Sequence, residues 1–454
     1  MVSSLSQQLI SLLGDSTVLP PDKLEGYAIE GLTPRVVVRP SSRQEIIEIM
    51  RWASAERLAV VPRGGGTQLS LGNLPQRVDL VLDLSSCHRV LDYQPADLTA
   101  TVEAGITLEA LQLELARGGK FAPLEAPMAG RATIGGILAT QASGPLRYTY
   151  GLARDWLIGI SVVSALGEET KAGGRVVKNV TGYDLNKLYT GSLGTLGVIV
   201  EATFKLTPAP AGFGALTAAF PSVTEGLEAS RNLLSQVFGP LGVQVISGQA
   251  AQRLDLAEPI PSFDRLGPGG AGLVAFFSGR PRSVNRRLGE SERLLTDQGA
   301  GSAHQLDESQ GRSVLRQLTD LGWATDAQPY LGLKINVPPS AVAGVVARLD
   351  PVNSLGQFPG VVADVGFGSI RLLWWTGSDG VEIGESAIPE TVNRVRELAR
   401  QAGGSAVVEQ CPRRAKEGLD VWGEPPQGIE IMRRIKQNFD PLGILNPGRF
   451  IGRL

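Results

Sequence analysis

Apolar residues in the first 206 positions recur with periods that predict strands and helices in alternation. The β-branched run Val36–Val38 predicts a strand. Ser42 and Glu45 are spaced as a capping box, and apolar positions recur at helical spacing after them, through Ala53. A second apolar strand, 58–61, follows directly. Further strands are expected at 80–84, 99–102, 157–164 and 198–206, and a helix at 107–115.

The pattern changes in the second half of the chain. From Tyr330 onward it predicts the order β-α-β-β-α-β, which is the ferredoxin-like split arrangement. Residues 214–300 repeat this pattern more weakly, with a Pro/Gly/Asp-rich interruption at 259–272. The fold class predicted from both halves is α+β. The expected elements of the clearer copy are strand 332–337, helix 340–349, strand 361–367, strand 370–375, helix 389–401 and strand 405–408.

A length of 454 residues is more than one ordinary core accommodates, so several domains are expected. The Pro/Ala/Gly-rich stretch 208–212 reads as a junction between two of them. We therefore expect an N-terminal helical segment at 1–30, a first domain at 31–210 and a second domain at 211–411. Residues 412–454 are expected to form a turn-rich tail that packs back on the first domain.

Small-residue clusters punctuate the first domain in a fixed order. Three consecutive glycines after an apolar strand leave main-chain amides that can approach a phosphate closely. The pair Gly135–Gly136, just after a Thr N-cap, predicts a helix start with free N–H groups. A mobile turn remains an alternative for the triplet alone. Together the clusters predict a large phosphate-bearing cofactor; they are Pro62–Thr67, Thr133–Gly136, Ala142–Pro145 and Gly191–Gly197.

Two other nucleotide-binding patterns are absent or misplaced. Gly267–Gly272 matches G-x-G-x-x-G by letters, but it precedes a predicted strand and opens no helix, so we interpret it as a surface loop. No glycine loop ends in Lys-Ser or Lys-Thr, so the chain has no P-loop sequence.

Composition excludes several classes of protein. A net charge of -2 provides no basic field for nucleic acid or anionic lipid. The two cysteines, Cys87 and Cys411, are far apart, which favours a reduced cytoplasmic compartment and argues against an iron–sulfur cluster in this chain. With two histidines, His88 and His304, no metal site is expected. No signal peptide or membrane span is expected, so any association with a membrane would come through a partner.

The clusters also carry a resemblance to a known family. The arrangement resembles flavoproteins with the vanillyl-alcohol-oxidase (PCMH-type) FAD domain, over about 33–206 and 440–450. The stretch Gly174–Leu185, running through Leu188 into Gly191–Ile199, is similar to the FAD-binding (E) subunit of bacterial glycolate oxidase. The resemblance implies FAD held between two α/β subdomains, with the second domain as a cap of ferredoxin-like units.

Carried over by position, the resemblance implies a set of cofactor-binding residues. The loop 62–68 would wrap the diphosphate with main-chain amides, and the residues of the second and third clusters would hold the diphosphate and ribityl chain. Core packing is the alternative for Ala139 and Ile199. The full set is Pro62, Arg63, Gly64, Gly65, Gly66, Thr67, Gln68, Thr133, Ile134, Gly135, Gly136, Ala139, Ser143, Gly144, Tyr150, Gly151, Asp155, Ile199 and Asn446.

The chain departs from its relatives at two points. Relatives with covalent flavin carry His where this chain has Thr67, so FAD is expected to be non-covalent. Related catalytic subunits carry a metal-binding His cluster in the cap, which two histidines cannot supply. Carboxylate-binding candidates remain in the predicted cap, and solvated surface charge is the alternative for each; no catalytic base is identified. These candidates are Lys334, Arg371, Arg413 and Arg414.

The resemblance implies an FAD-binding subunit of a glycolate oxidase-type complex that oxidises a 2-hydroxy acid. Its expected partners are a catalytic flavoprotein subunit and an iron–sulfur subunit. One alternative is a self-sufficient FAD oxidoreductase for another 2-hydroxy acid or alcohol. The other is a non-catalytic structural subunit that keeps the fold without FAD, against which the intact glycine clusters argue.

Overall fold

The structure is a computed structural model that describes residues 4–174, 183–237, 239–256, 258–264, 266–267, 269–324, 328–349, 355, 357–376 and 384–454. Its mixed helix and sheet confirm the predicted α+β class. The chain divides into two compact units. The first comprises Met1–Ala142, Leu152–Ala209 and Glu424–Leu454, and the second comprises Ser143–Gly151 and Pro210–Gly423. Residues 175–182, the centre of the glycolate-oxidase-like stretch, lie outside the described residues.

The first unit contains two sheets with separate cores. A parallel sheet has the order β1-β3-β2, formed by Val36–Val38, Leu80–Asp83 and Val60–Arg63. Helix α2 (Arg43–Ala55) packs on it, and the Ser42 hydroxyl caps this helix by accepting a hydrogen bond from the Glu45 N–H. The N-terminal elements of this unit are α1 (Ser4–Leu13), η1 (Asp15–Thr17) and η2 (Pro21–Tyr27).

The second sheet of this unit is antiparallel and has the order β4-β5-β9-β7-β8. Helices α3 and α4 bury their apolar faces against it. The strands are β4 (Val90–Gln94), β5 (Thr99–Glu103), β7 (Leu157–Val163), β8 (Glu169–Gly173) and β9 (Val198–Lys205). The helices are α3 (Leu108–Ala116), α4 (Ile134–Thr140), α6 (Ala153–Trp156) and α7 (Leu185–Tyr189), and η3 (Leu84–Ser86) follows β3. A two-stranded ladder joins β6 (Lys120–Phe121) to β10 (Thr207–Pro208).

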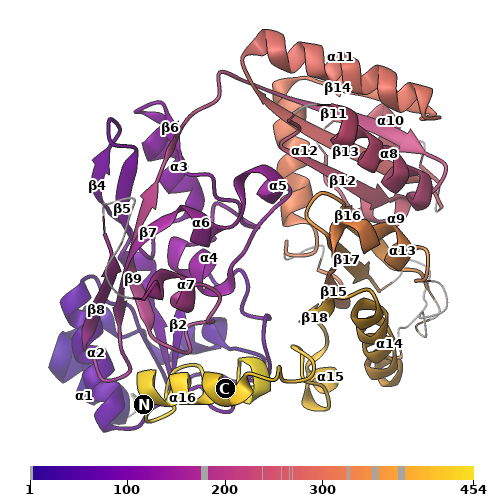
Figure 1. Cartoon of the computed structure of the whole chain (residues 1–454). Coiled ribbons are helices and arrows are strands. Elements are labelled where there is room, and N and C mark those ends of the chain that lie inside the picture. Colours follow the sequence, from indigo (N-terminus) through magenta and orange to yellow (C-terminus); the bar gives the residue numbers. More distant parts are fainter. Residues whose placement is uncertain are drawn as a thin grey trace. The chain divides into compact units, whose positions relative to one another are not determined.

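The tail returns to the first unit. Helix α16 (Ile429–Phe439), yellow in Figure 1, is followed by a segment whose Leu445 forms a parallel bridge with Val60 of β2. The Asn446 N–H donates to the Val60 carbonyl at 3.0 Å, and the Val60 N–H donates to the Ile444 carbonyl at 2.7 Å. The chain ends in η7 (Ile451–Arg453). The last residues therefore extend the edge of the parallel sheet next to the strand that enters the glycine triplet.

The second unit is built on one eight-stranded sheet, ordered β14-β11-β13-β12-β16-β17-β15-β18. Both halves of the sheet follow the element order β-α-β-β-α-β, and they meet at the antiparallel pair β12–β16. The first half is β11 (Gly212–Phe220), α8 (Val223–Gln236), β12 (Gly242–Ser247), β13 (Ala271–Gly279), α11 (Pro281–Asp297) and β14 (Ser302–Leu306). The second half is β15 (Leu331–Asn336), α13 (Val342–Val346), β16 (Gly360–Asp364), β17 (Ser369–Trp374), α14 (Ile388–Gln401) and β18 (Ser405–Gln410).

Helices cover the two faces of this sheet unequally. The larger core lies under α8, α11, α13 and α14, all on one face (Figure 1). On the other face, a smaller core lies under the short helices α9 (Gly248–Ala251) and α10 (Pro261–Asp264) and under α12 (Glu308–Asp320). The rest of that second face, over β16, β17, β15 and β18, carries charged side chains instead. The unit also includes α5 (Arg147–Tyr150), η4 (Pro339–Ala341), η6 (Glu385–Ala387) and α15 (Arg413–Glu417).

The units differ from the expected domain boundaries at two places. Residues 143–151, expected within the first domain, group with the second unit, where Arg147 contacts Asp364 at 3.5 Å. The return to the first unit occurs at Glu424 rather than at 412. None of the helices in the described ranges is long and apolar enough to cross a membrane.

Candidate functional site

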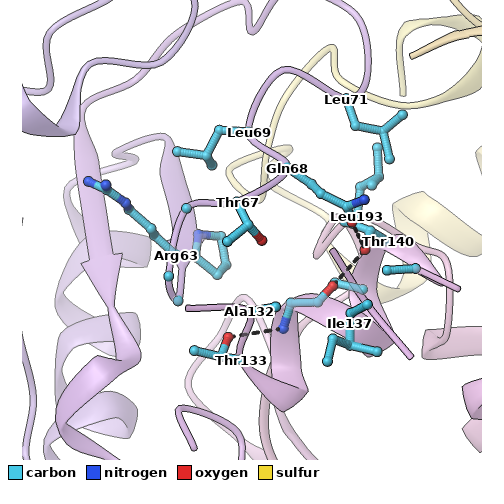
Figure 2. Close-up of a pocket in the computed structure, with 18 of the residues that line it drawn as sticks. Arg63, Thr67, Gln68, Leu69, Leu71, Ala132, Thr133, Ile137, Thr140 and Leu193 are labelled. Carbon is cyan, nitrogen blue, oxygen red and sulfur yellow. Dashed lines mark hydrogen bonds between the residues drawn. The ribbon is translucent and has the colours of Figure 1, made fainter. Parts of the chain in front are cut away.

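Two adjoining cavities in the first unit have volumes of about 690 and 410 Å³, mouths included. Figure 2 shows residues of a cavity wall drawn from the loop after β2, from helix α4 and from the segment around Leu193. The two cavities share a wall and form one continuous candidate site; the shared residues are Pro62, Arg63, Gly64, Thr133, Gly136, Ala139 and Leu193.

The glycine triplet is packed tightly against the start of α4. An added Cβ would lie 2.0 Å from Thr133 Oγ1 at Gly64, and 1.8 Å from the Arg131 carbonyl at Gly65. Gly66 has a φ of +68°, a conformation that a side chain makes costly. The described residues accept no hydrogen bond from the main-chain N–H groups of 64–67. The loop therefore presents four consecutive free N–H groups, which is the arrangement that binds anions.

Helix α4 forms the second wall. Thr133 caps it, with Oγ1 accepting from the Gly136 N–H at 3.4 Å, while the Gly135 N–H donates to the Ala104 carbonyl at 2.7 Å. At the other end of the helix, the Thr140 hydroxyl lies 2.6 Å from Gln68 Oε1 (Figure 2). This contact ties the end of the glycine loop to α4, so the two walls hold a fixed separation.

The tail and the Gly191–Gly197 cluster form the third wall. Asn446 Nδ2 donates to the Leu193 carbonyl at 2.6 Å, and both residues have a left-handed backbone, with φ of 45° and 52°. The Arg449 guanidinium donates to the carbonyls of Leu69 and Leu71, each at 2.6 Å. Burial lowers the pKa of Arg449 to about 10. Since Asn446 and Arg449 both line the larger cavity, the tail closes this site.

Most of the predicted cofactor residues line these cavities. Gly135 and Ile199 line the smaller one, and Ile134 is buried in the core beneath it. The larger cavity is lined by Pro62, Arg63, Gly64, Gly65, Gly66, Thr67, Gln68, Thr133, Gly136, Ala139 and Asn446.

Besides Ile134, five predicted residues are not among those lining the cavities. Ser143, Gly144, Tyr150 and Gly151 belong to the second unit. Asp155 lies on α6, where its Oδ2 accepts from the Leu152 N–H at 2.8 Å. The roles of these five residues toward the cofactor stay predictions.

Sequence reasoning missed several cavity residues. Arg449 follows the Asn-Pro-Gly turn, and nothing in the letters indicates that its side chain is buried. Thr140 is the last residue of α4, whereas the sequence signal for a binding site lies at the start of that helix. Leu193 lies inside the Gly191–Gly197 cluster, but its left-handed backbone, with a φ of 52°, is visible only in the structure. The apolar residues Leu69 and Leu71 carry no sequence signal for a site.

The residues present fit a flavin dinucleotide. Four free N–H groups suit a diphosphate, and the two adjoining cavities with a shared wall suit an extended ligand. Asn446 Oδ1 is buried and accepts no hydrogen bond from the described residues, so it remains an acceptor for a hydroxyl or N–H of a ligand. Thr67 lines the same cavity at the position where a covalent tether would need a His.

On the charged half of the second unit's sheet face, one carboxylate faces two cations. The Glu409 carboxylate lies 3.2 Å from Arg371 Nε and 4.0 Å from Lys334 Nζ. Arg371 also donates to the Leu321 carbonyl at 2.7 Å. Burial lowers the pKa of Lys334 to about 8, although Glu409 opposes that shift. In the described ranges no group of three or more His, Cys, Asp or Glu side chains could hold a metal ion.

A glycine loop with free N–H groups, a capped helix start and a closing tail around one pair of cavities define a flavin-dinucleotide-binding domain. Comparison with known families agrees. The description "FAD binding domain" matches residues 34–173, and "FAD linked oxidases, C-terminal domain" matches residues 213–450. The second match covers more than half of the chain, so the protein belongs to the FAD-linked oxidase family. FAD is its cofactor, and it is an FAD-dependent oxidoreductase.

Similar proteins include 2-hydroxy-acid enzymes. The glycolate oxidase subunit GlcD of Bacillus subtilis is 28% identical over 437 residues, covering 92% of this chain and 89% of that protein. The D-2-hydroxyglutarate dehydrogenase of Xanthomonas citri is 38% identical over 212 residues, 47% of this chain and 43% of its own length. The solved p-cresol methylhydroxylase shares the fold, with a TM-score of 0.74, 18% identity and coverage of 98% and 95%.

Proposed function

We propose that this chain is an FAD-bearing, electron-carrying subunit of a glycolate oxidase-type 2-hydroxy-acid dehydrogenase. Its partners in this proposal are a catalytic flavoprotein subunit and an iron–sulfur subunit. The B. subtilis relative, matched over nearly its whole length, is itself named as a subunit of glycolate oxidase. When bound, FAD supplies a two-electron acceptor and a carrier that can pass electrons to a partner.

The observation that supports the subunit role is that two cations of the second unit already face a carboxylate of the same chain. Oxidation of a 2-hydroxy acid needs a cation for the carboxylate and a base for the hydroxyl proton. Arg371 and Lys334 are two of the predicted carboxylate-binding cations, and Glu409 faces both. His304 lies on β14, paired with Thr217 of β11, while His88 in the first unit contacts the Ser85 carbonyl. Within the second unit, His304 therefore lies on the edge strand at the other end of the sheet from β15, β17 and β18, which carry this cluster.

The residues of the first unit would do the binding. The N–H groups of 64–67 would hold the diphosphate, and Asn446 Oδ1 would accept from the cofactor. Gln68, fixed by Thr140, and Arg449, fixed on two carbonyls, would keep the walls in place without contacting a substrate. This division assigns cofactor retention to the first unit and leaves substrate oxidation to a partner.

An anaerobic visible spectrum of the purified chain, taken before and after glycolate, tests the proposal. We expect an oxidised flavin band that glycolate leaves unchanged, because the Glu409 carboxylate already pairs with Arg371 and faces Lys334, the cations that a substrate carboxylate would need. Dithionite added to the same sample must bleach the band, which shows that the flavin is reducible. Bleaching by glycolate alone would overturn the relay role. A chain that cannot take up flavin would overturn the cofactor assignment and favour a structural subunit.

A self-sufficient dehydrogenase is the second candidate, and one observation favours it. With a pKa of about 8, Lys334 is partly neutral near physiological pH, so it could accept a hydroxyl proton. The Xanthomonas relative, named for D-2-hydroxyglutarate, points to a larger 2-hydroxy acid. D-2-hydroxyglutarate and D-lactate should therefore be added in the same anaerobic titration. Bleaching that is lost in Lys334→Met but kept in Lys187→Met would establish this candidate.

A further inference from the structure

The N-terminal elements precede both family matches, the first of which begins at residue 34, yet they contact the cofactor loop. Element η2 ends at Tyr27, and its neighbour Gly26 accepts a hydrogen bond from Arg63 NH1 at 3.1 Å. Arg63 is the last residue of β2, directly before the glycine triplet. The contact therefore joins a segment without an assigned role to the start of the cofactor loop.

The Arg63 side chain is packed between this segment and the loop. Its guanidinium carbon lies 4.1 Å from the centroid of the Tyr27 ring. A Cβ at Gly66 would lie 2.9 Å from Arg63 Nε and 3.0 Å from its NH2, so the guanidinium also abuts the last glycine of the triplet. Figure 2 shows this side chain extending away from Thr133 while the main chain of its loop stays at the cavity. Arg63 thus spans from Tyr27 to Gly66.

Two polar contacts fix the Tyr27 ring in turn. Its hydroxyl donates to Asp83 Oδ2 at 2.7 Å and accepts from Arg39 at 2.5 Å, and Arg39 Nε donates to the same carboxylate oxygen at 2.9 Å. Asp83 is buried on β3, opposite Arg63 in the parallel register. Burial raises the pKa of Asp83, but hydrogen bonds from Tyr27, Ser85 and Arg39 outweigh it and hold the pKa below its ordinary value. The carboxylate is therefore a charged anchor at neutral pH.

We propose that Tyr27 is a positioning residue for FAD: through the Arg63 guanidinium it holds the glycine loop in its anion-binding conformation. A run of three glycines is costly to order, because glycine loses more backbone freedom than any other residue. Ordering the loop before the cofactor arrives removes that cost from binding and raises affinity. The proposal rests on FAD as the cofactor and not on the subunit role, so glycolate oxidation by the chain would leave it intact.

The test measures FAD affinity of the full-length apoprotein by flavin fluorescence, alongside thermal unfolding without FAD. Tyr27→Leu removes the ring and the hydroxyl, and should weaken FAD binding by about 2- to 30-fold, the range of a partly buried cation–π contact. Tyr27→Phe removes the hydroxyl but keeps the ring, so it should lose stability and keep affinity within about two-fold.

Tyr93→Leu is the matched control. Tyr93 lies on the other sheet, with its hydroxyl donating to the Leu115 carbonyl at 2.7 Å, so its loss should cost stability without changing FAD affinity. Arg63→Met should weaken FAD binding as Tyr27→Leu does, and the double variant should be no weaker than either single variant. The proposal fails if Tyr27→Leu binds FAD as the wild type does, or if the affinities of all variants simply follow their stabilities.

Discussion

Lys334 is a largely buried cation of the second unit, and its burial costs free energy of folding. Its side chain is 27% exposed, and it shares the Glu409 carboxylate with Arg371, whose own contact to that group is shorter. Burial penalises the charged ammonium more than the distant carboxylate rewards it, which is why its pKa is lowered. In such a triad the weaker ion pair can be replaced by an apolar side chain without leaving the carboxylate alone.

Replacing Lys334 by Met should therefore stabilise the protein at neutral pH, by on the order of 1–3 kcal/mol. Between pH 8 and 10.5 the unfolded chain keeps the Lys334 proton that the folded chain has lost, so wild-type stability rises with pH and the difference shrinks. Urea unfolding at about pH 7 and about pH 10 measures this. Lys187→Met, at an exposed lysine, is the control and should show no such trend. A Lys334→Met advantage that grows with pH would contradict the assignment.

The loop after β2 is the element where sequence and structure give different reasons for the same residues. The sequence favours glycine because bare amides can approach a phosphate. The structure adds that Gly64 and Gly65 have no room for a Cβ, because Thr133 and the Arg131 carbonyl already occupy it. Glycine at these two positions is therefore needed for the packing of the loop on the start of α4, independently of any ligand. A Gly65→Arg variant would therefore not test phosphate binding alone, because it would also disturb this packing.

Comparing Gly65→Ala with Gly119→Ala separates the effect of a close contact, at Gly65, from the effect of backbone strain, at Gly119. At Gly65 the new methyl would meet a main-chain carbonyl at 1.8 Å, so both thermal stability and bound flavin should fall. Gly119 has a φ of +67° with open space around it, so alanine there should cost only the strain of about 1–2 kcal/mol and leave flavin content unchanged. Wild-type stability in Gly65→Ala would show that the loop can move off α4.

Local elements were predictable because their patterns are local. The strand at Val36–Val38 and the helix that Ser42 caps form as expected, since propensity, capping and burial agree there. The segment 143–151 was not predictable. Its Arg147 contacts Asp364 in the second unit, and no periodicity within nine residues can reveal which core they join. The cavity walls from β2 and α4 follow from glycine signals, whereas Arg449 depends on burial that only the fold creates.

At the scale of the whole molecule, side chains of the C-terminal segment 436–449 connect distant parts of the first unit. Lys436 Nζ donates to the Thr195 and Leu445 carbonyls at 2.8 and 2.9 Å, and pairs with the buried Asp440 at 2.6 Å. Arg449 and Asn446 add the contacts to Leu69, Leu71 and Leu193 described above. Residues more than 240 positions apart are thus fixed to one another by side chains that bind main-chain carbonyls.

Arg449→Met should remove the donors of two buried carbonyls, at a cost of about 1–3 kcal/mol for each one left unsatisfied. We expect lower thermal stability and a faster loss of FAD on dilution, measured by the recovery of flavin fluorescence. Arg453→Met, at an exposed arginine of the same tail, is the control and should change neither quantity. If Arg449→Met retains FAD as the wild type does, the tail is only a covering element and not a wall of the site.

The position of these tail contacts in the chain has a consequence for biosynthesis. Translation proceeds from the N-terminus, so the glycine loop and α4 leave the ribosome long before Asn446 and Arg449 exist. A nascent chain therefore carries two walls of the cavity before the third has been synthesised, and the complete lining exists only once residues 446 and 449 have been added. A chain truncated before Asn446 would keep the glycine clusters but lack the third wall of the site.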